Sequence, residues 1–180
     1  MASRSRADSP RGATGDHLRS KRPRSIIAGP YGHPFHPIAV TIPIGTWVAS
    51  IVFDIIGFFV EDPTPYVVGA EVLILIGLIG AVFAAVLGLM DYSTLAAGTP
   101  ARRTALVHMV LNLSVVAIFL ISLIVRLNSE QDEVSVVGFI LSLIGAAALT
   151  VSGWLGGKLS YHYGVRVADE ATQSEGFRST

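Results

Sequence analysis

The stretch YVVGAEVLILIGLIGAVFAAVLGLM, residues 66–90, contains a single charged side chain, Glu71, in an otherwise apolar run. A helix that crosses the roughly 30 Å hydrocarbon core of a bilayer needs about 20 predominantly apolar residues. A surface helix of a soluble protein would carry a polar face along its length, and this stretch has none. The stretch therefore predicts a membrane-spanning helix.

Three further apolar stretches of similar length surround this one, at residues 37–60, 104–127 and 134–157. The segments between them are short, and short connections make consecutive helices antiparallel neighbours. The composition agrees, because only 14% of the residues are charged, whereas soluble domains average about 25%. We therefore predict an all-α membrane protein with four antiparallel transmembrane helices in an up-down-up-down bundle.

Polar segments flank the predicted bundle on both sides. Residues 1–31 form a basic tail rich in Ser, Arg, Gly and Pro, a composition that favours disorder. Residues 32–165 form the four-helix domain, and residues 166–180 form a polar C-terminal tail. The positive charges of the first tail would attract anionic lipid headgroups; alternatively, they only set the orientation of the chain in the membrane.

Lys and Arg are distributed very unevenly among the connecting segments. Arg126 lies at the outer end of the third stretch, and the other 12 of the 13 basic residues fall in the first tail, the second connection and the segment after the fourth stretch. Cytoplasmic segments of membrane proteins carry an excess of Lys and Arg. We therefore expect both termini and the second connection to lie in the cytoplasm.

Several classes of function receive no support from the residues. The chain has no cysteine, which excludes thiolate metal sites and cysteine nucleophiles within it. Phosphate-binding loops, Gly-x-Ser-x-Gly elbows and His-Glu-x-x-His helices are absent from the sequence. We therefore do not predict an enzyme, and we expect membrane lipids rather than nucleic acid as a binding partner.

Histidines gather at the predicted cytoplasmic face. A b-type haem in a helical bundle needs two axial imidazoles from different helices, inside an apolar slot. His36 begins the first apolar stretch and His108 lies one turn inside the third, so these two are the first candidate pair. His162, after the fourth stretch, is the next candidate. Asn112 shares a helix face with His108, and Asp91 closes the second stretch on this side.

Small residues recur at helical spacing in the second and fourth stretches. They would leave room for a haem macrocycle, but small residues also let transmembrane helices pack closely, which is their commonest role. Both roles remain open. The residues are Gly77, Gly80, Ala84 and Gly88 in the second stretch, and Gly145, Ala148, Ser152 and Gly156 in the fourth.

His33 and His36 form a second candidate metal site. Both precede proline, which favours an extended or polyproline backbone. Three residues of polyproline helix rise about 9 Å, whereas each zinc-bound imidazole nitrogen lies about 2.0–2.1 Å from the ion. Chelation by both rings therefore needs a bend at Phe35.

Charged residues also occur near the other face of the predicted membrane. Asp54 and Glu71 lie at similar depths in neighbouring helices, and Arg126 lies nearby. Intramembrane charged residues are costly and therefore suggest function. One hypothesis is a proton or cation site, with one carboxylate protonated because like charges repel. The alternative is a structural ion pair of Arg126 with Asp54 or with Glu71.

Five stretches of the chain carry a resemblance to a known family. They are GHPFHPIAVTIPIG (32–45), FD (53–54), GLMDY (88–92), TPARRTALVHMVLN (99–112) and SGWLGGKLSYHYGV (152–165). Through them the chain resembles the domain-of-unknown-function family 2231, a bacterial family of four-helix integral membrane proteins. The resemblance implies the bacterial cytoplasmic membrane, and a redox setting, because relatives accompany Rieske-type or cytochrome-like proteins. Thr41 stands where many relatives carry a further histidine.

Three functional hypotheses follow. The first is a small redox-associated, electron-transfer or haem- or metal-binding membrane subunit that uses the cytoplasmic histidines and works with a redox protein, a membrane complex or further copies of itself. The second is a structural or assembly subunit without a cofactor. The third is a proton-linked transporter that uses Asp54 and Glu71.

Overall fold

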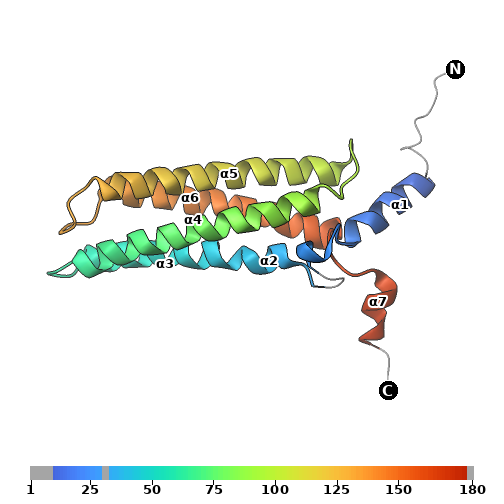
Figure 1. Ribbon diagram of the computed structural model, residues 1–180, viewed down its shortest axis with the longest axis horizontal. Helices are drawn as coiled ribbons and strands as arrows, with labels where there is room; N and C mark the ends of the chain where they lie inside the picture. The colour runs from blue at the N-terminus through green and yellow to red at the C-terminus, as the bar shows by residue number, and fades with distance from the viewer. Residues whose placement is uncertain (1–9, 30–32, 178–180) are drawn as a thin grey trace.

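The computed structural model describes residues 10–29 and 33–177, and these ranges contain helices and connecting segments but no strand. Four long helices lie side by side as a bundle (Figure 1): α3 (Thr41–Gly57), α4 (Thr64–Tyr92), α5 (Pro100–Leu127) and α6 (Val136–Gly157). The short helix α2 (Phe35–Ala39) continues directly into α3, and the π-helix η3 (Lys158–His162) continues α6.

Four helical segments in the described ranges are long and apolar enough to cross a membrane. They are Phe35–Gly57, Thr64–Tyr92, Pro100–Leu127 and Val136–His162. Their outward side chains are apolar, as in α4, where Ile79 and Val82 are more than 60% exposed. Exposed apolar surface on this scale suits lipid rather than water. The prediction of four long apolar helices is confirmed, and all four are candidate membrane spans.

Local sequence signals account for the beginnings of the helices. Thr99 caps α5, because its hydroxyl accepts a hydrogen bond from the backbone N–H of Arg102, and Pro100 occupies the first helical position. Ser135 caps α6 in the same way through the N–H of Gly138. Hydroxyl side chains are favoured before a helix because they satisfy donors that have no partner within it.

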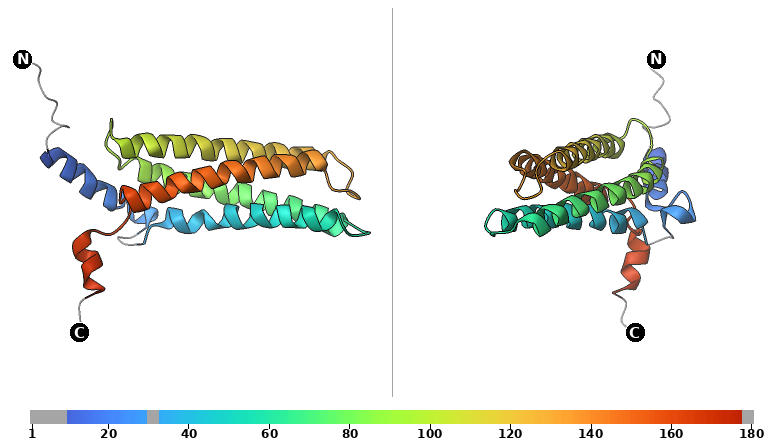
Figure 2. Two further views of the ribbon diagram at one scale, coloured as in Figure 1. Left: turned by 180° about the vertical axis from the view of Figure 1, so that it is seen from behind. Right: turned by 60° about the vertical axis from the view of Figure 1, so that its left-hand side comes forward.

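Consecutive helices are neighbours in the bundle. The most extensive packing joins α3 with α4 and α5 with α6, and smaller contacts join α4 with α5 and α3 with α6. Consequently α3 and α5 occupy diagonal corners, as do α4 and α6 (Figure 2). Helices α1 (Pro10–Lys21) and α7 (Glu170–Glu175) lie at one end of the bundle, together with the α4–α5 connection (Figure 1). We call this the terminal end and the opposite one the loop end; the assignment of the terminal end to the cytoplasm remains a prediction.

The segments outside the bundle contain more helix than their composition suggests. The expected disordered tail includes helix α1 (Pro10–Lys21) and the 3₁₀ turn η2 (Ile26–Ala28), and the C-terminal tail includes helix α7 (Glu170–Glu175). The two tails are joined by hydrogen bonds, since the buried Lys21 ammonium donates to the carbonyl of Ala168. Residues 1–9, 30–32 and 178–180 lie outside the described ranges.

The bundle interior is organised around aromatic side chains that reach across its diagonal. Trp47 of α3 stacks on Phe119 of α5, with ring centroids 4.2 Å apart and planes 7° from parallel. Trp47 Nε1 also donates to the carbonyl of Ile74 in α4. These rings are almost fully buried in the largest apolar cluster of the described residues. The largest apolar cluster of the described residues therefore joins the diagonal helices α3 and α5 and also includes residues of α4.

Three side-chain pairs join the first span to α5 across the diagonal, and in each pair the two sequence numbers differ by 72. The pairs are His36–His108, Trp47–Phe119 and Asp54–Arg126. The fully buried Ser50 and Ser122 follow the same offset. The first span and α5 therefore run parallel and present equivalent positions to the bundle axis.

A related offset of 68 residues connects α4 with α6. A Cβ atom added to Gly77 would collide with the Trp47 ring, and one added to Gly145 would lie 2.7 Å from the Phe119 ring. Gly88 and Gly156 contact His36 and His108 in the same manner. The hairpin of the first two spans and the hairpin of the last two are thus structural repeats in the same orientation, as in proteins built on an axis along the membrane normal.

The close contact at Gly145 predicts that Gly145→Ala destabilises the bundle. The new methyl group would overlap Phe119, and overpacking a core costs about 1–3 kcal/mol. Thermal unfolding in detergent would show the loss. Gly153→Ala is the matched control, because Gly153 lies in the same helix with no atom within 4 Å of the added Cβ. Its expected effect is neutral or stabilising by up to about 1 kcal/mol, since alanine favours helix. Equal effects of the two substitutions would contradict the role of Gly145.

Candidate functional site

His36 enters the bundle at the terminal end of the first span. Pro34 precedes α2 with an extended backbone, and the helix then turns His36 toward α4. The ring Nδ1 lies 2.9 Å from the carbonyl oxygen of Ala84. The ring also packs on Gly88, where an added Cβ would lie 3.0 Å from His36 Cε1. The imidazole of His36 therefore fits against α4 because Gly88 has no side chain.

His108 occupies the equivalent place in the second hairpin. Its Nδ1 lies 2.8 Å from the carbonyl oxygen of Ser152 in α6, and its ring packs on Gly156. Asn112, one turn further along α5, donates from Nδ2 to the carbonyl of His108 and lies 3.1 Å from the ring Nε2. The predicted association of Asn112 with His108 is thus a direct hydrogen bond within α5.

The two rings meet near the bundle axis. Their centroids are 6.5 Å apart and their planes are perpendicular, at 89°. A backbone carbonyl only accepts hydrogen bonds, so each Nδ1 carries a proton, and in the neutral form of such a ring the lone pair is on Nε2. Metal-ligating histidines are oriented in this way, by donating the other ring N–H to a carbonyl. The site therefore brings together two similarly oriented imidazoles from diagonal helices.

The spacing of the rings suits coordination of one iron from opposite sides. Two imidazoles placed so are roughly 6 Å apart between centroids, given a metal–nitrogen distance of about 2.0–2.1 Å. The separation of the two rings is therefore close to that of two imidazoles held by one metal ion. The imidazoles occupy the space that side chains at positions 88 and 156 would need, beside Gly88 and Gly156. Aromatic rings occupy the corresponding space beside Gly77 and Gly145. These four glycines consequently serve close packing.

The other predicted ligands lie outside this pair. His162 is exposed, and its ring contacts Tyr163 with centroids 4.8 Å apart. His33 is also exposed, so that the structure associates His36 with His108 rather than with its neighbour in the sequence. Within residues 10–29 and 33–177, no group of three or more His, Asp or Glu side chains is placed to hold a metal ion.

A charged pair lies near the loop end of the same diagonal. Arg126 Nη1 and Nη2 donate to Asp54 Oδ1 and Oδ2 at 2.6 and 2.7 Å, and both residues are at most 1% exposed. Ser122 and Ser142 accept further hydrogen bonds from the guanidinium at 3.2 Å. Two parallel charge-assisted bonds of this kind are strong and geometrically specific. Of the two alternatives at this face, the structure contains the ion pair with Asp54.

Glu71 belongs to a separate contact. Its Oε1 accepts a hydrogen bond of 3.1 Å from Gln131 Nε2, in the connection between α5 and α6. Asp54 and Glu71 therefore lie on neighbouring helices but are turned toward different partners. The sequence analysis expects similar depths for both residues, and in the structure the direction of each side chain decides which one reaches Arg126.

Asp91 pairs with Arg166, a residue that the sequence analysis placed in a polar tail. Arg166 Nε lies 3.1 Å from Asp91 Oδ1, and its Nη2 donates to the carbonyl of Ala28 at 2.9 Å. The backbone of Arg166 is left-handed, with φ +60°, which is uncommon for a residue with a side chain. This contact joins the end of α4 to both tails. No helical periodicity extends to residue 166, so no sequence pattern indicates it.

Four apolar spans, with the paired histidines and the buried ion pair between them, define the chain as a multi-pass membrane protein. Comparison with known families then places it: residues 32–169 match the family described as predicted membrane protein, DUF2231, and the chain belongs to this family. The resemblance seen in the sequence is confirmed. No curated protein and no solved structure matches the chain.

The buried ion pair predicts strongly non-additive substitutions. Asp54→Leu or Arg126→Met would each leave one buried charge without its partner, at a cost of about 3–5 kcal/mol. The double variant removes both charges and is expected to lose much less stability than either single variant. Thermal unfolding of the detergent-purified proteins measures this, with Glu130→Gln, at an exposed loop position, as the control. Additive losses in the double variant would refute the coupling.

Proposed function

We propose that this protein is a haem-binding subunit of the bacterial cytoplasmic membrane, in which His36 and His108 are the two axial ligands of a b-type haem. The observation that carries the proposal is the pair of imidazoles near the bundle axis, 6.5 Å apart between centroids. Each ring is held by a carbonyl of the adjacent helix, through Ala84 or Ser152. Haem bound there would supply one-electron chemistry.

The surroundings support ligands that remain neutral and fixed. Each ring has a hydrogen bond from Nδ1, a glycine beneath it and the apolar bundle around it. Rings that are positioned before the cofactor arrives lose little freedom on coordination, which favours binding. The repeat of the two hairpins supports the same proposal, because it presents the two ligands from equivalent positions.

Asn112 has a defined part in this proposal. Its amide donates to His108 Nε2, the atom that would bind iron. In the cofactor-free protein this hydrogen bond satisfies a polar atom inside the bundle, where an unsatisfied one would be costly. A metal held at Nε2 would take the place of this hydrogen bond, and Asn112 would keep its other bond, from Nδ2 to the carbonyl of His108.

The position of the site suggests the partner. His36 and His108 lie toward the terminal end, which the distribution of Lys and Arg assigns to the cytoplasm. Electrons would therefore be exchanged with a redox protein, or a membrane complex, that approaches this end. A homo-oligomer is a further arrangement in which haem groups of neighbouring copies exchange electrons within the membrane.

A structural or assembly subunit without a cofactor is the second candidate. It is favoured by the hydrogen bond between Asn112 and His108 Nε2, which satisfies that ring without a metal. Perpendicular aromatic rings at this separation also attract each other in the absence of any ligand. The hypothesis of a proton-linked transporter is weaker, because Asp54 has both carboxylate oxygens engaged by Arg126.

The proposal predicts a Soret absorption band in protein purified in mild detergent, or after addition of haem to the purified protein. His36→Ala and His108→Ala should each abolish the bis-histidine spectrum, because each removes an axial ligand. His33→Ala and His162→Ala are matched controls at exposed positions and should leave it unchanged.

Three results would contradict haem binding at this pair. They are a protein that shows no Soret shift after haem addition, a spectrum that survives both His36→Ala and His108→Ala, and a metal ion bound without porphyrin. Metal analysis on the same preparation identifies the third result. The first, combined with a stable stoichiometric complex in pull-down experiments, would favour the structural subunit.

A further inference from the structure

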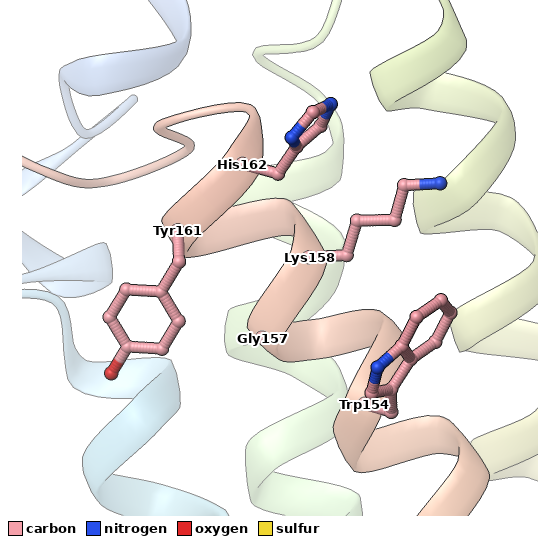
Figure 3. A pocket seen from close by; sticks show the side chains of 5 residues that line it. All are labelled: Trp154, Gly157, Lys158, Tyr161 and His162. Carbon is pink, nitrogen blue, oxygen red and sulfur yellow. The ribbon is translucent and has the colours of Figure 1, made fainter.

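A shallow pocket lies on the outer surface of the bundle, where α6 passes into η3 (Figure 3). Its volume is about 640 Å³, and it is lined by Trp154, Gly157, Lys158, Tyr161 and His162. In the close-up, Lys158 and Trp154 lie on one side of Gly157 and Tyr161 lies on the other. Gly157 has no side chain, so the helix backbone is accessible between the side chains of Lys158 and Trp154 and that of Tyr161.

The π-helical turn shapes this pocket. The N–H of Tyr163 donates to the carbonyl of Lys158, five residues earlier, rather than to the residue four earlier that an α-helix would use. This wider turn changes the angular spacing of the side chains that follow Lys158. Single π-helical turns inside α-helices are frequently found at functional sites.

The pocket carries a positive charge that no carboxylate neutralises. The Lys158 ammonium lies 6.0 Å from the centroid of the Trp154 ring and 5.7 Å from that of Tyr163. Among the described residues, the ion pairs Asp54–Arg126 and Asp91–Arg166 do not involve Lys158. Aromatic rings attract a cation without cancelling its charge. The ammonium therefore remains available to an anionic ligand.

The position of the pocket along the fourth span suggests which kind of molecule carries that anion. The fourth span ends at His162, so the pocket lies at the boundary between hydrocarbon and headgroups. Trp154 and Tyr161 are 69% and 92% exposed, and such amphipathic rings favour this boundary. Exposed apolar side chains follow the same helix toward the membrane centre. These are Val151, Ile144 and Ile140.

We infer that this pocket binds the phosphate headgroup of an anionic phospholipid in the leaflet at the terminal end. Lys158 supplies the charge, the Tyr161 hydroxyl and the His162 ring supply further polar groups, and Gly157 permits close approach. The acyl chains extend along the exposed apolar face of α6. A soluble phosphate would use the polar groups but not this apolar face. The inference is independent of haem binding, since it uses neither His36 nor His108.

Quenching of Trp154 fluorescence by brominated lipids tests this inference. The chain has two tryptophans, and Trp47→Phe removes the buried one while keeping an aromatic ring against Phe119. The protein is placed in phosphatidylcholine vesicles that contain either dibromo-phosphatidylglycerol or dibromo-phosphatidylcholine at equal mole fraction. Enrichment of the anionic lipid at Trp154 should be roughly fivefold, the effect expected of one lysine at a charged leaflet.

Lys158→Gln should abolish the preference for the anionic lipid, whereas Arg103→Gln, at an exposed position at the terminal end of α5, should preserve it. Circular dichroism confirms that each variant is folded. Equal quenching by the two lipids, or a preference that survives Lys158→Gln, would overturn the inference. Loss of the preference on addition of inorganic phosphate would show that the pocket recognises a free anion, and would also overturn the lipid assignment.

Discussion

The bidentate bond between Asp54 and Arg126 sets the register of the bundle. Two charges in an apolar interior are tolerated only when they are paired and hydrogen-bonded, so α3 and α5 are fixed at the height where the carboxylate meets the guanidinium. A shift by one residue would move one helix by about 1.5 Å and break this geometry. In both spans the histidine lies 18 residues before the charged residue. Fixing the register at the loop end therefore also brings the two imidazoles to one height at the terminal end.

Helices α4 and α6 make this diagonal contact possible because they carry glycine, without a side chain, at the positions of contact. Gly77 and Gly145 provide space for aromatic rings, Gly138 provides space for the Arg126 side chain, and Gly88 and Gly156 provide space for the histidines. Side chains from α3 and α5 can then reach the axis between two backbones. The same arrangement supplies carbonyl groups at the right height, and these orient the imidazoles. Packing and the candidate site thus depend on one set of small residues.

The sequence predicted the features that depend on depth along a helix, and it left open those that depend on rotation about it. Apolar length identified four spans, and counting residues from the predicted ends placed His36 and His108 at one face. Asp54 and Glu71 have similar depths, so only the direction of each side chain could decide which of them reaches Arg126. The association of Asp91 with Arg166 depends on a left-handed residue after the last span, where no periodic pattern exists. Helix α1 was missed because its composition resembles that of a disordered chain.

The repeated hairpins differ in one respect that has a consequence for assembly. At the equivalent position, one hairpin carries a carboxylate and the other a guanidinium. Two copies of the first hairpin in one bundle would oppose two negative charges, and two copies of the second would oppose two positive charges. This position therefore distinguishes unlike from like hairpins. If two chains exchanged hairpins, each bundle would still need one hairpin of each kind, because only then does the carboxylate meet the guanidinium.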